Sequence, residues 1–356
     1  MTGRPEGTAG PPGGLRIATW NVEWFDALFD DAGRLWDDAA VSGRHGVTRR
    51  AQGDAVALVL RALNPDAVMV IEAPDQNRQR STVAALEGFA ARYGLRQCRS
   101  VAGYANDSQQ EIALMFDPLV VQARHDPVGG GPEGFGQKPV ARFDQTLSLD
   151  LNLDGLSEEV HFSKPPLEVA LTCRGHSIRL IGVHLKSKAP YGAHSKAQEI
   201  RIAIENRRKQ LAQSLWVRQR VLAHLAAGQA LIVLGDFNDG PGLDDYEKLF
   251  GRSGVEVVLG WDEAKATRLY DPHARLALGS KLGASPVSSR FFIVEEGRYL
   301  QALLDYIMVS PDLRALQPVW RIWHPFDDPA CFGDAALREA LLAASDHFPV
   351  SLDLPL

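Results

Sequence analysis

The stretch LIVLGDFNDGPG, residues 231–242, joins a short apolar run directly to a group of turn-forming residues. The run LIVL is typical of a buried strand. Asp, Asn, Gly and Pro form turns because they tolerate unusual backbone angles or hydrogen-bond their own main chain, so the stretch alone indicates an ordinary loop more often than a site. Asp236 and Asn238 nevertheless stand where a strand ends. Whether Asp236 and Asn238 belong to a site depends on whether other strands end in the same way.

Polar residues adjoin four other apolar runs. The segments are TWNVEW with Asn21 and Glu23, VIEA with Glu72, VHLKSK with His184, and SDHFPV with Asp346 and His347. Strand ends in a layered fold can converge at one edge, which is the usual place for a ligand site. Convergence would gather Glu72, Asp236 and Asp346, and two charges about 4 Å apart cost roughly 4 kcal/mol at an effective dielectric near 20. Such a cluster needs a cation, and oxygen ligands favour Mg²⁺ or Mn²⁺ over zinc.

The remaining sequence predicts one domain that mixes strands and helices. Short apolar, β-branched runs predict strands at residues 15–20, 67–72, 112–116, 146–153, 178–184, 230–235, 304–310 and 348–354. Apolar periodicity and stop signals predict helices over 48–65 and 196–228. No linker divides the series. We expect a flexible tail over 1–14 and a single domain over 15–356, with surface insertions near 26–47 and 125–139.

Composition excludes some classes of protein. Of the 356 residues, 45% are hydrophobic and 23% charged, as in ordinary globular proteins. The net charge of -6 argues against tight binding of nucleic acid through bulk positive charge, but not against an enzyme that meets a polyanion through a metal. No membrane span or secretory signal is evident, and the three cysteines lie far apart. We therefore expect a cytoplasmic monomer with no membrane contact and no obligate protein partner.

Six blocks together resemble a known family. TWNVEW, VIEA, VHLKSK, GDFND, LLDYIMVS and SDHFPV occur in this order between residues 15 and 354. They are similar to the signature blocks of the endonuclease/exonuclease/phosphatase superfamily, which includes pancreatic-type deoxyribonucleases, abasic-site endonucleases, inositol polyphosphate 5-phosphatases and neutral sphingomyelinases. The resemblance implies an α+β fold, a four-layer αββα sandwich of two packed, mostly antiparallel β-sheets flanked by helices.

The resemblance also implies roles for the acidic and amide side chains. Glu72 matches the principal metal ligand, with Asn21 beside it and Asp346 as a further carboxylate on the metal side. Asp236 matches the residue that orients or deprotonates the attacking water, and Asn238 the residue that binds the phosphate.

Two histidines complete the implied site. His347 matches the residue that contacts the scissile phosphate, and Asp305 the carboxylate that holds this histidine. His184 matches the first histidine of the deoxyribonuclease and sphingomyelinase branches. The abasic-site branch lacks that histidine, which makes that activity a weaker expectation.

Several positions leave alternatives open. Lys164 stands where the family usually has arginine, and lysine offers a point charge in place of a two-pronged clamp. With Lys186 and Lys188 it is a candidate contact for substrate phosphate. Either Gln110 or Glu111 could support His184, because a shift of one residue turns a side chain to the other face of a strand. Glu23 could share the metal site or be a surface charge.

The sequence thus predicts a divalent-metal-dependent phosphodiester hydrolase, with a nuclease acting on DNA or RNA as the leading hypothesis. The alternative is a phosphatase or phosphodiesterase of a small molecule or lipid headgroup. The extra basic motifs of inositol phosphatases and an amphipathic membrane segment are not found in the sequence. A catalytically dead phosphate-binding module is disfavoured, because Glu72, Asp236 and His347 are all present.

Overall fold

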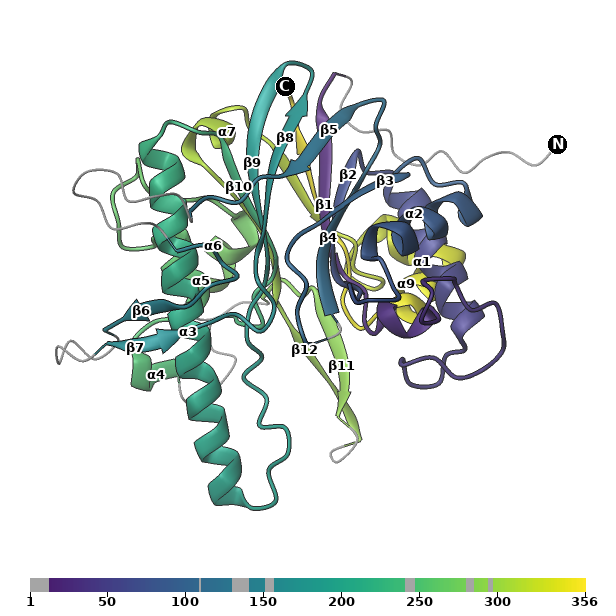
Figure 1. Cartoon of the computed structure of the whole chain (residues 1–356), viewed down its shortest axis with the longest axis horizontal. Coiled ribbons are helices and arrows are strands. Elements are labelled where there is room, and N and C mark those ends of the chain that lie inside the picture. The colour runs from purple at the N-terminus through teal and green to yellow at the C-terminus, as the bar shows by residue number, and fades with distance from the viewer. Residues whose placement is uncertain are drawn as a thin grey trace.

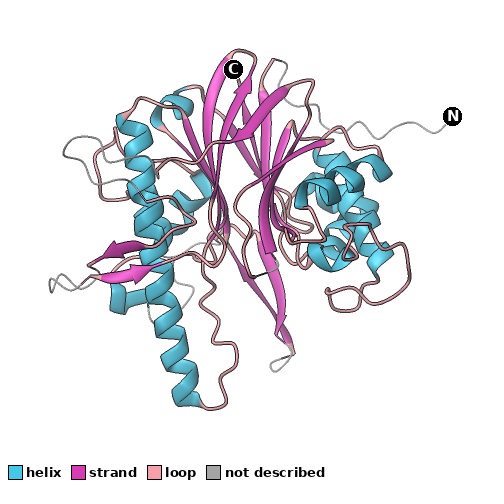
Figure 2. Cartoon of the chain, viewed as in Figure 1, coloured by secondary structure: helices cyan, strands magenta, loops and turns pink. Residues whose placement is uncertain are grey.

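The chain folds into four layers, with two β-sheets packed face to face in the middle and helices on both outer sides (Figures 1 and 2). The computed structural model describes residues 13–108, 110–129, 141–150, 157–240, 247–279, 285–293 and 297–356. The predicted sandwich of two sheets flanked by helices is confirmed.

The larger sheet has six strands in the order β14-β15-β1-β2-β4-β3. Its strands are β1 (Leu15–Asn21), β2 (Ala67–Pro74), β3 (Arg99–Ala102), β4 (Gln110–Phe116), β14 (Val319–Ile322) and β15 (Val350–Leu354). The neighbours β1 and β2 run parallel, and the other pairs run antiparallel.

The smaller sheet has five strands in the order β13-β10-β9-β8-β5. Its strands are β5 (Val121–His125), β8 (Leu167–Cys173), β9 (His176–His184), β10 (Leu231–Asp236) and β13 (Asp305–Val309). Here too one pair, β9 and β10, is parallel and the others are antiparallel. Both sheets are therefore mostly antiparallel, as expected.

Two short ribbons and the helices complete the fold. The ribbons pair β6 (Leu147–Leu149) with β7 (Glu158–Val160), and β11 (Ser289–Ile293) with β12 (Arg298–Ala302). The helices are η1 (Phe25–Leu28), α1 (Arg49–Leu63), α2 (Thr82–Tyr93), α3 (Lys196–Ala226), α4 (Glu247–Phe250), α5 (Gly254–Leu259), α6 (Pro272–Gly279), α7 (Pro311–Ala315), α8 (Pro329–Gly333) and α9 (Ala335–Ala344).

Three apolar cores separate the four layers. One lies between α1, α2 and α9 and the larger sheet, one between the two sheets, and one between the smaller sheet and α3 and α5. Successive strand residues point to opposite faces, so each inner strand serves two cores. In β10, Ile232 and Leu234 enter the middle core, whereas Leu231 and Val233 pack toward the helices.

The two predicted helices form close to their expected bounds. Thr48 caps α1 by accepting a hydrogen bond from the backbone N–H of Ala51, and the left-handed Asn64 before Pro65 ends the helix. Ser195 caps the long helix α3 in the same way.

Other expectations are met only in part. The strand expected over 146–153 is the short β6, which lies in a ribbon outside the two main sheets, and residues 151–156 lie outside the described residues. The sequence did not predict β3, β5, β7, β8, β11, β12 or β14. Residues 1–12 of the expected tail and 130–139 of the second expected insertion are likewise not described. Within the described residues, no helix is both long and apolar enough to cross a membrane.

Candidate active site

Three of the predicted site residues lie side by side at the ends of neighbouring strands. Asp236, the last residue of β10, pairs in register with His184 of β9 and with Asp305 of β13. Asp236 follows Ile232 and Leu234 at intervals of two, so it points to the same face as these middle-core residues. The strand period therefore directs this carboxylate into the edge of the space between the two sheets.

Gly235 permits the close strand pairing just before this carboxylate. Its φ is 138°, and a Cβ at this position would lie 2.1 Å from the carbonyl oxygen of Val183. Only glycine meets both demands, because it has no Cβ and tolerates positive φ.

Asp236 is held by amide groups from two directions. Its Oδ2 accepts hydrogen bonds from Nδ2 of Asn21 at 3.0 Å and from Nδ2 of Asn238 at 3.1 Å, and its Oδ1 accepts one from the backbone N–H of Asn238 at 2.7 Å. Nδ2 of Asn238 also donates to the carbonyl oxygen of Leu185 at 3.1 Å. Both amide protons of Asn238 thus point to protein acceptors, an arrangement that orients Asp236. Burial, opposed by nearby His347, raises the pKa of Asp236 to about 7.

His347 forms a buried pair with Asp305. Its Nδ1 lies 2.8 Å from Oδ2 of Asp305, which also accepts a hydrogen bond from the hydroxyl of Ser288 at 2.8 Å. Burial alone would lower the pKa of His347, but the carboxylates of Asp305 and Asp236 raise it well above its usual range. His347 is therefore an imidazolium that has Asp305 as its orienting partner.

His184 has the opposite charge state. Burial, with the positive charges of Lys164 and His347, holds its pKa well below the usual range. Nε2 of His184 lies 3.3 Å from Nζ of Lys164 and 3.6 Å from Oδ2 of Asp236. Because the imidazole is neutral, its approach to Asp236 is not a salt bridge.

Glu72 reaches the site through a local departure from strand geometry. The pairing of β2 with β4 shifts between Ile71 and Ala73, and Glu72 between them has a φ of 64°. Its Oε2 accepts a hydrogen bond from the backbone N–H of Trp24 at 3.0 Å. A bulge with a left-handed residue is strained, and such strain is concentrated at functional sites because it re-aims a side chain.

Two carboxylates on this side of the site have raised pKa values in spite of nearby positive charges. Burial, followed by the negative charge of Glu72, raises the pKa of Asp26 to about 6. Burial also raises the pKa of Asp346, and Glu72 adds to that effect although His347 and Arg44 oppose it. Mutually destabilised carboxylates are what a divalent cation would relieve.

The donor set fits a hard divalent cation. Asn21 uses its Nδ2 on Asp236, whereas its Oδ1 is buried and has no hydrogen-bond partner within the described part of the chain. This oxygen, with the carboxylates of Glu72 and Asp346, supplies the ligand chemistry of Mg²⁺ or Mn²⁺.

A different trio of side chains has its ligand atoms at metal-like spacing. Asp236, Asp305 and His347 each place one ligand atom within 4.8 Å of the others. In this trio, however, the His347 imidazolium already supplies the positive charge between two carboxylates.

Two positions left open by the sequence now have partners. The carboxylate of Glu23 forms an ion pair with Arg44, whose guanidinium also donates to the carbonyl oxygen of Leu342, so an arginine already neutralises Glu23. Glu111 accepts hydrogen bonds from the backbone N–H of Gln76 at 3.3 Å and from Nδ2 of Asn106 at 2.6 Å. His184 has no partner for its Nδ1 among the described residues.

The three candidate phosphate-binding lysines differ in their surroundings. Lys164 lies beside His184, and burial lowers its pKa although Glu72 and Asp236 oppose the change. Burial and Lys209 lower the pKa of Lys186. Nζ of Lys188 donates to Oδ1 of the buried Asp239 at 2.5 Å, so this lysine belongs to an internal ion pair.

Two serines at the site were not identified from the sequence. The hydroxyl of Ser288 accepts from the backbone N–H groups of Leu304 and Asp305, both at 3.0 Å, while it donates to the Asp305 carboxylate. Ser345 accepts from the backbone N–H of His347 at 3.0 Å and donates to the carbonyl oxygen of Asn21 at 2.7 Å. Ser345 adjoins Asp346 in a recognised block and could have been found, whereas no pattern marks Ser288.

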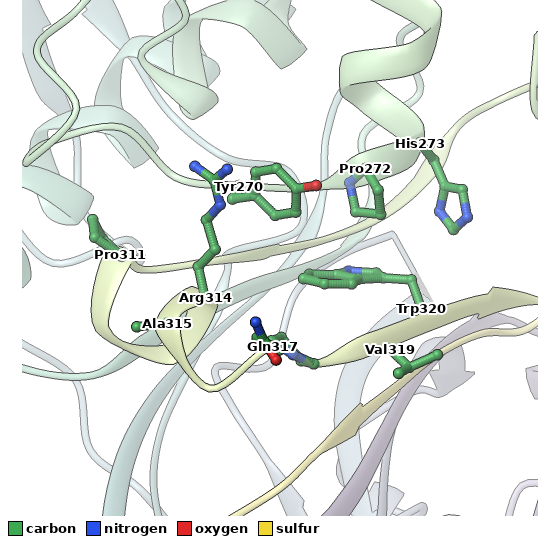
Figure 3. A pocket seen from close by; sticks show the side chains of 10 residues that line it. Tyr270, Pro272, His273, Pro311, Arg314, Ala315, Gln317, Val319 and Trp320 are labelled. Carbon is green, nitrogen blue, oxygen red and sulfur yellow. The ribbon is translucent and has the colours of Figure 1, made fainter.

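A separate hollow lies between α6, α7 and β14 (Figure 3). The rings of Tyr270 and Trp320 meet there with centroids 5.5 Å apart, and the guanidinium of Arg314 lies 4.0 Å from the centre of the Tyr270 ring. None of the predicted site residues lines this hollow.

Sequence comparison gives the class of the protein. The family model described as "Endonuclease/Exonuclease/phosphatase family" matches residues 18–347. The chain belongs to this family of metal-dependent phosphoesterases, and the match includes all of the predicted site residues. The comparison with curated proteins gives no significant match.

Several solved structures are similar over most of their length. An AP endonuclease from Archaeoglobus fulgidus has 14% identity and a TM-score of 0.48, covering 96% of this chain and all of its own. The human Nocturnin catalytic domain with bound sulfate has 15% identity and a TM-score of 0.47. The match covers 97% of this chain and 95% of the Nocturnin domain. D. rerio TDP2 complexed with a single-strand DNA product has 13% identity and a TM-score of 0.47. The match covers 96% of this chain and 98% of the TDP2 chain. Similarity at this level gives no information about the substrate of this chain.

Proposed function

We propose that this protein is a divalent-metal-dependent phosphodiesterase that hydrolyses nucleic acid. The observation that carries the proposal is the arrangement around Asp236: a carboxylate fixed by Asn21 and Asn238 beside an imidazolium fixed by Asp305. The proposal treats residues 15–356 as one catalytic domain that acts as a monomer in the cytoplasm. The three cores shared between the layers support a single domain.

Glu72, Asn21 and Asp346 would hold the cation. When bound, a divalent ion neutralises phosphate oxygens and polarises the phosphorus for attack by water. The chain contributes the preorganised carboxylate and amide groups, so that little rearrangement is needed when substrate arrives.

Asp236 and His347 then divide the chemistry. Asp236 accepts the proton of the attacking water, a role that suits a carboxylate whose pKa is raised to about 7. His347 places a positive charge and an N–H group where negative charge grows on the phosphoryl oxygens, and Asp305 keeps its ring in position. His184, Lys164 and Lys186 would contact the phosphate group, and Asn238 would orient Asp236.

A substrate panel tests the proposal. The purified protein is incubated with Mg²⁺ or Mn²⁺ and with single- and double-stranded DNA, RNA, phosphorylated sugars, and sphingomyelin. We expect cleavage of nucleic acid, with an Asp236→Ala variant as the inactive control. Turnover of a small phosphoester or sphingomyelin, with no cleavage of any nucleic acid, would refute the nuclease proposal. It would favour a phosphatase or phosphodiesterase of a small molecule or lipid headgroup.

A further inference from the structure

The β11–β12 ribbon forms an arm that extends past the ends of both sheets (Figure 1). It does not belong to either main sheet. An isolated two-stranded ribbon is only marginally stable in water, and this one exposes the apolar side chains of Phe292, Tyr299 and Leu300. The arm therefore calls for a functional explanation.

The base of the arm is attached directly to the candidate active site. Ser289 forms a β-bridge with His347, and the backbone N–H of Phe348 donates to the carbonyl oxygen of Ser288 at 2.6 Å. The backbone N–H of Arg290 donates to the carbonyl oxygen of Asp346 at 2.7 Å. Any ligand on the arm would thus lie at a fixed place relative to the reacting group.

The strand register separates the arm into two faces. Phe291 is paired with Leu300, and their shared face turns toward the site, because the Phe291 and His347 ring centroids are 5.8 Å apart. Leu300 keeps 36% of its surface exposed. On the opposite face Phe292 is paired with Tyr299, and these two rings pack together with centroids 5.1 Å apart.

We propose that the Phe291 and Leu300 face binds an unpaired nucleobase beside the scissile phosphate, so that the substrate is single-stranded DNA or RNA. This inference rests on the proposed function and names its substrate class. A flat apolar face suits any base, because every base offers a π-face, whereas a base within a duplex has both faces covered by its neighbours.

The same arm fits a lipid surface less well. Its outermost described pair is Ile293 with Arg298, so a charged side chain lies where an arm that enters lipid needs apolar residues. On the other face the guanidinium of Arg290 lies 3.4 Å from the centre of the Tyr299 ring, which makes that face partly cationic as well. Ring and guanidinium together are typical of surfaces that bind single strands.

The test compares strands that differ only in their bases. The full chain with Mg²⁺ is given a twelve-residue oligothymidylate, an RNA strand of the same length, the matching duplexes, and a base-free sugar-phosphate strand. We expect the wild type to prefer single strands to duplexes and base-bearing to base-free strands. Phe291→Ala should reduce the base-bearing to base-free ratio of kcat/KM by roughly 5- to 150-fold, the range that one stacked base supplies.

Matched variants separate stacking from a general disturbance of His347. Phe291→Tyr retains a ring and should retain the ratio, and Phe292→Ala on the opposite face should leave it unchanged. Circular dichroism verifies that each variant is folded.

The possible outcomes distinguish the two proposals. Strand cleavage with an unchanged ratio in Phe291→Ala, or a wild-type preference for duplex, overturns the role of the arm and leaves the nuclease proposal standing. No cleavage of any nucleic acid, with or without turnover of sphingomyelin vesicles or small phosphoesters, overturns both.

Discussion

Nδ1 of His347 lies 2.8 Å from Oδ2 of Asp305, although the two residues are 42 positions apart in the sequence. The contact joins a residue three positions before β15 of the larger sheet to the first residue of β13 in the smaller sheet. It therefore links the two sheets at the candidate active site.

This pairing predicts unequal effects of two substitutions. His347→Ala should reduce kcat by about 10²- to 10⁴-fold, the usual cost of losing an acid, a base or a charge-stabilising group. Asp305→Asn should cost less, because the imidazole remains but is less well held. Steady-state rates on the best substrate of the panel measure both effects, and an unchanged rate in Asp305→Asn would refute the pairing.

The second prediction concerns the cation. Excess EDTA should abolish turnover, and Glu72→Gln should raise the Mg²⁺ concentration that gives half-maximal rate by about tenfold or more, as expected when a metal site loses a ligand or its support. Glu87→Gln, on helix α2 and ion-paired with Arg99, is the matched control and should leave the metal titration unchanged. Full activity after dialysis against chelator would exclude the proposed metal site.

Ser288 should act as a positioning residue. Ser288→Ala removes the hydrogen bond to Asp305 and leaves the backbone N–H groups of Leu304 and Asp305 without their acceptor, at a cost of about 1–3 kcal/mol in unfolding free energy. We also expect kcat to fall about tenfold with little change in KM.

The neighbouring Ser289 provides the control for this prediction. Its hydroxyl donates to the carbonyl oxygen of Ala302 at 2.9 Å, and not to Asp305. Ser289→Ala should lower stability with kcat retained. Equal losses of kcat in the two variants would assign Ser288 a purely structural role.

Gly235→Ala should destabilise the fold severely. The added Cβ would meet the carbonyl oxygen of Val183 at 2.1 Å, so β9 and β10 would have to separate, and the positive φ adds strain. We expect a loss above about 3 kcal/mol in chemical denaturation. Gly228→Ala, at φ 67° with no atom within 4 Å of the new Cβ, should cost only about 1–2 kcal/mol. Similar losses at both positions would show that the contact with Val183 is unimportant.

The raised pKa of Glu111 predicts that the stability of the fold depends on pH. Burial raises the pKa of Glu111 to about 7, despite hydrogen bonds from Gln76 and Asn106 that favour the charged form. The folded state thus binds the proton more tightly than the unfolded chain. The resulting stabilisation is complete below about pH 4.5 and is lost as the pH rises through about 7. Its contribution to the free energy of unfolding is at most about 3 kcal/mol.

The Glu111→Gln variant removes this titration. Its stability relative to the wild type should therefore be more favourable at pH 8 than at pH 4.5, as measured by urea denaturation at both pH values. A relative stability that is the same at both pH values would contradict the raised pKa.

The sequence by itself determined the blocks, their order, and the direction of several side chains. Strand periodicity is local, so Ile232, Leu234 and Asp236 had to share a face once β10 formed. The expectation of a cation also came from the chain alone, since carboxylates that converge repel one another.

Tertiary structure alone decided which partner each group obtained. Lys188 pairs with Asp239, Glu23 with Arg44, and Ser288 with Asp305, and none of these pairs follows from a sequence pattern. Partners depend on the order and register of strands and on loops that connect distant segments, which are long-range properties. Periodicity gives the face on which a side chain lies, but only the packing of the two sheets sets what it meets there.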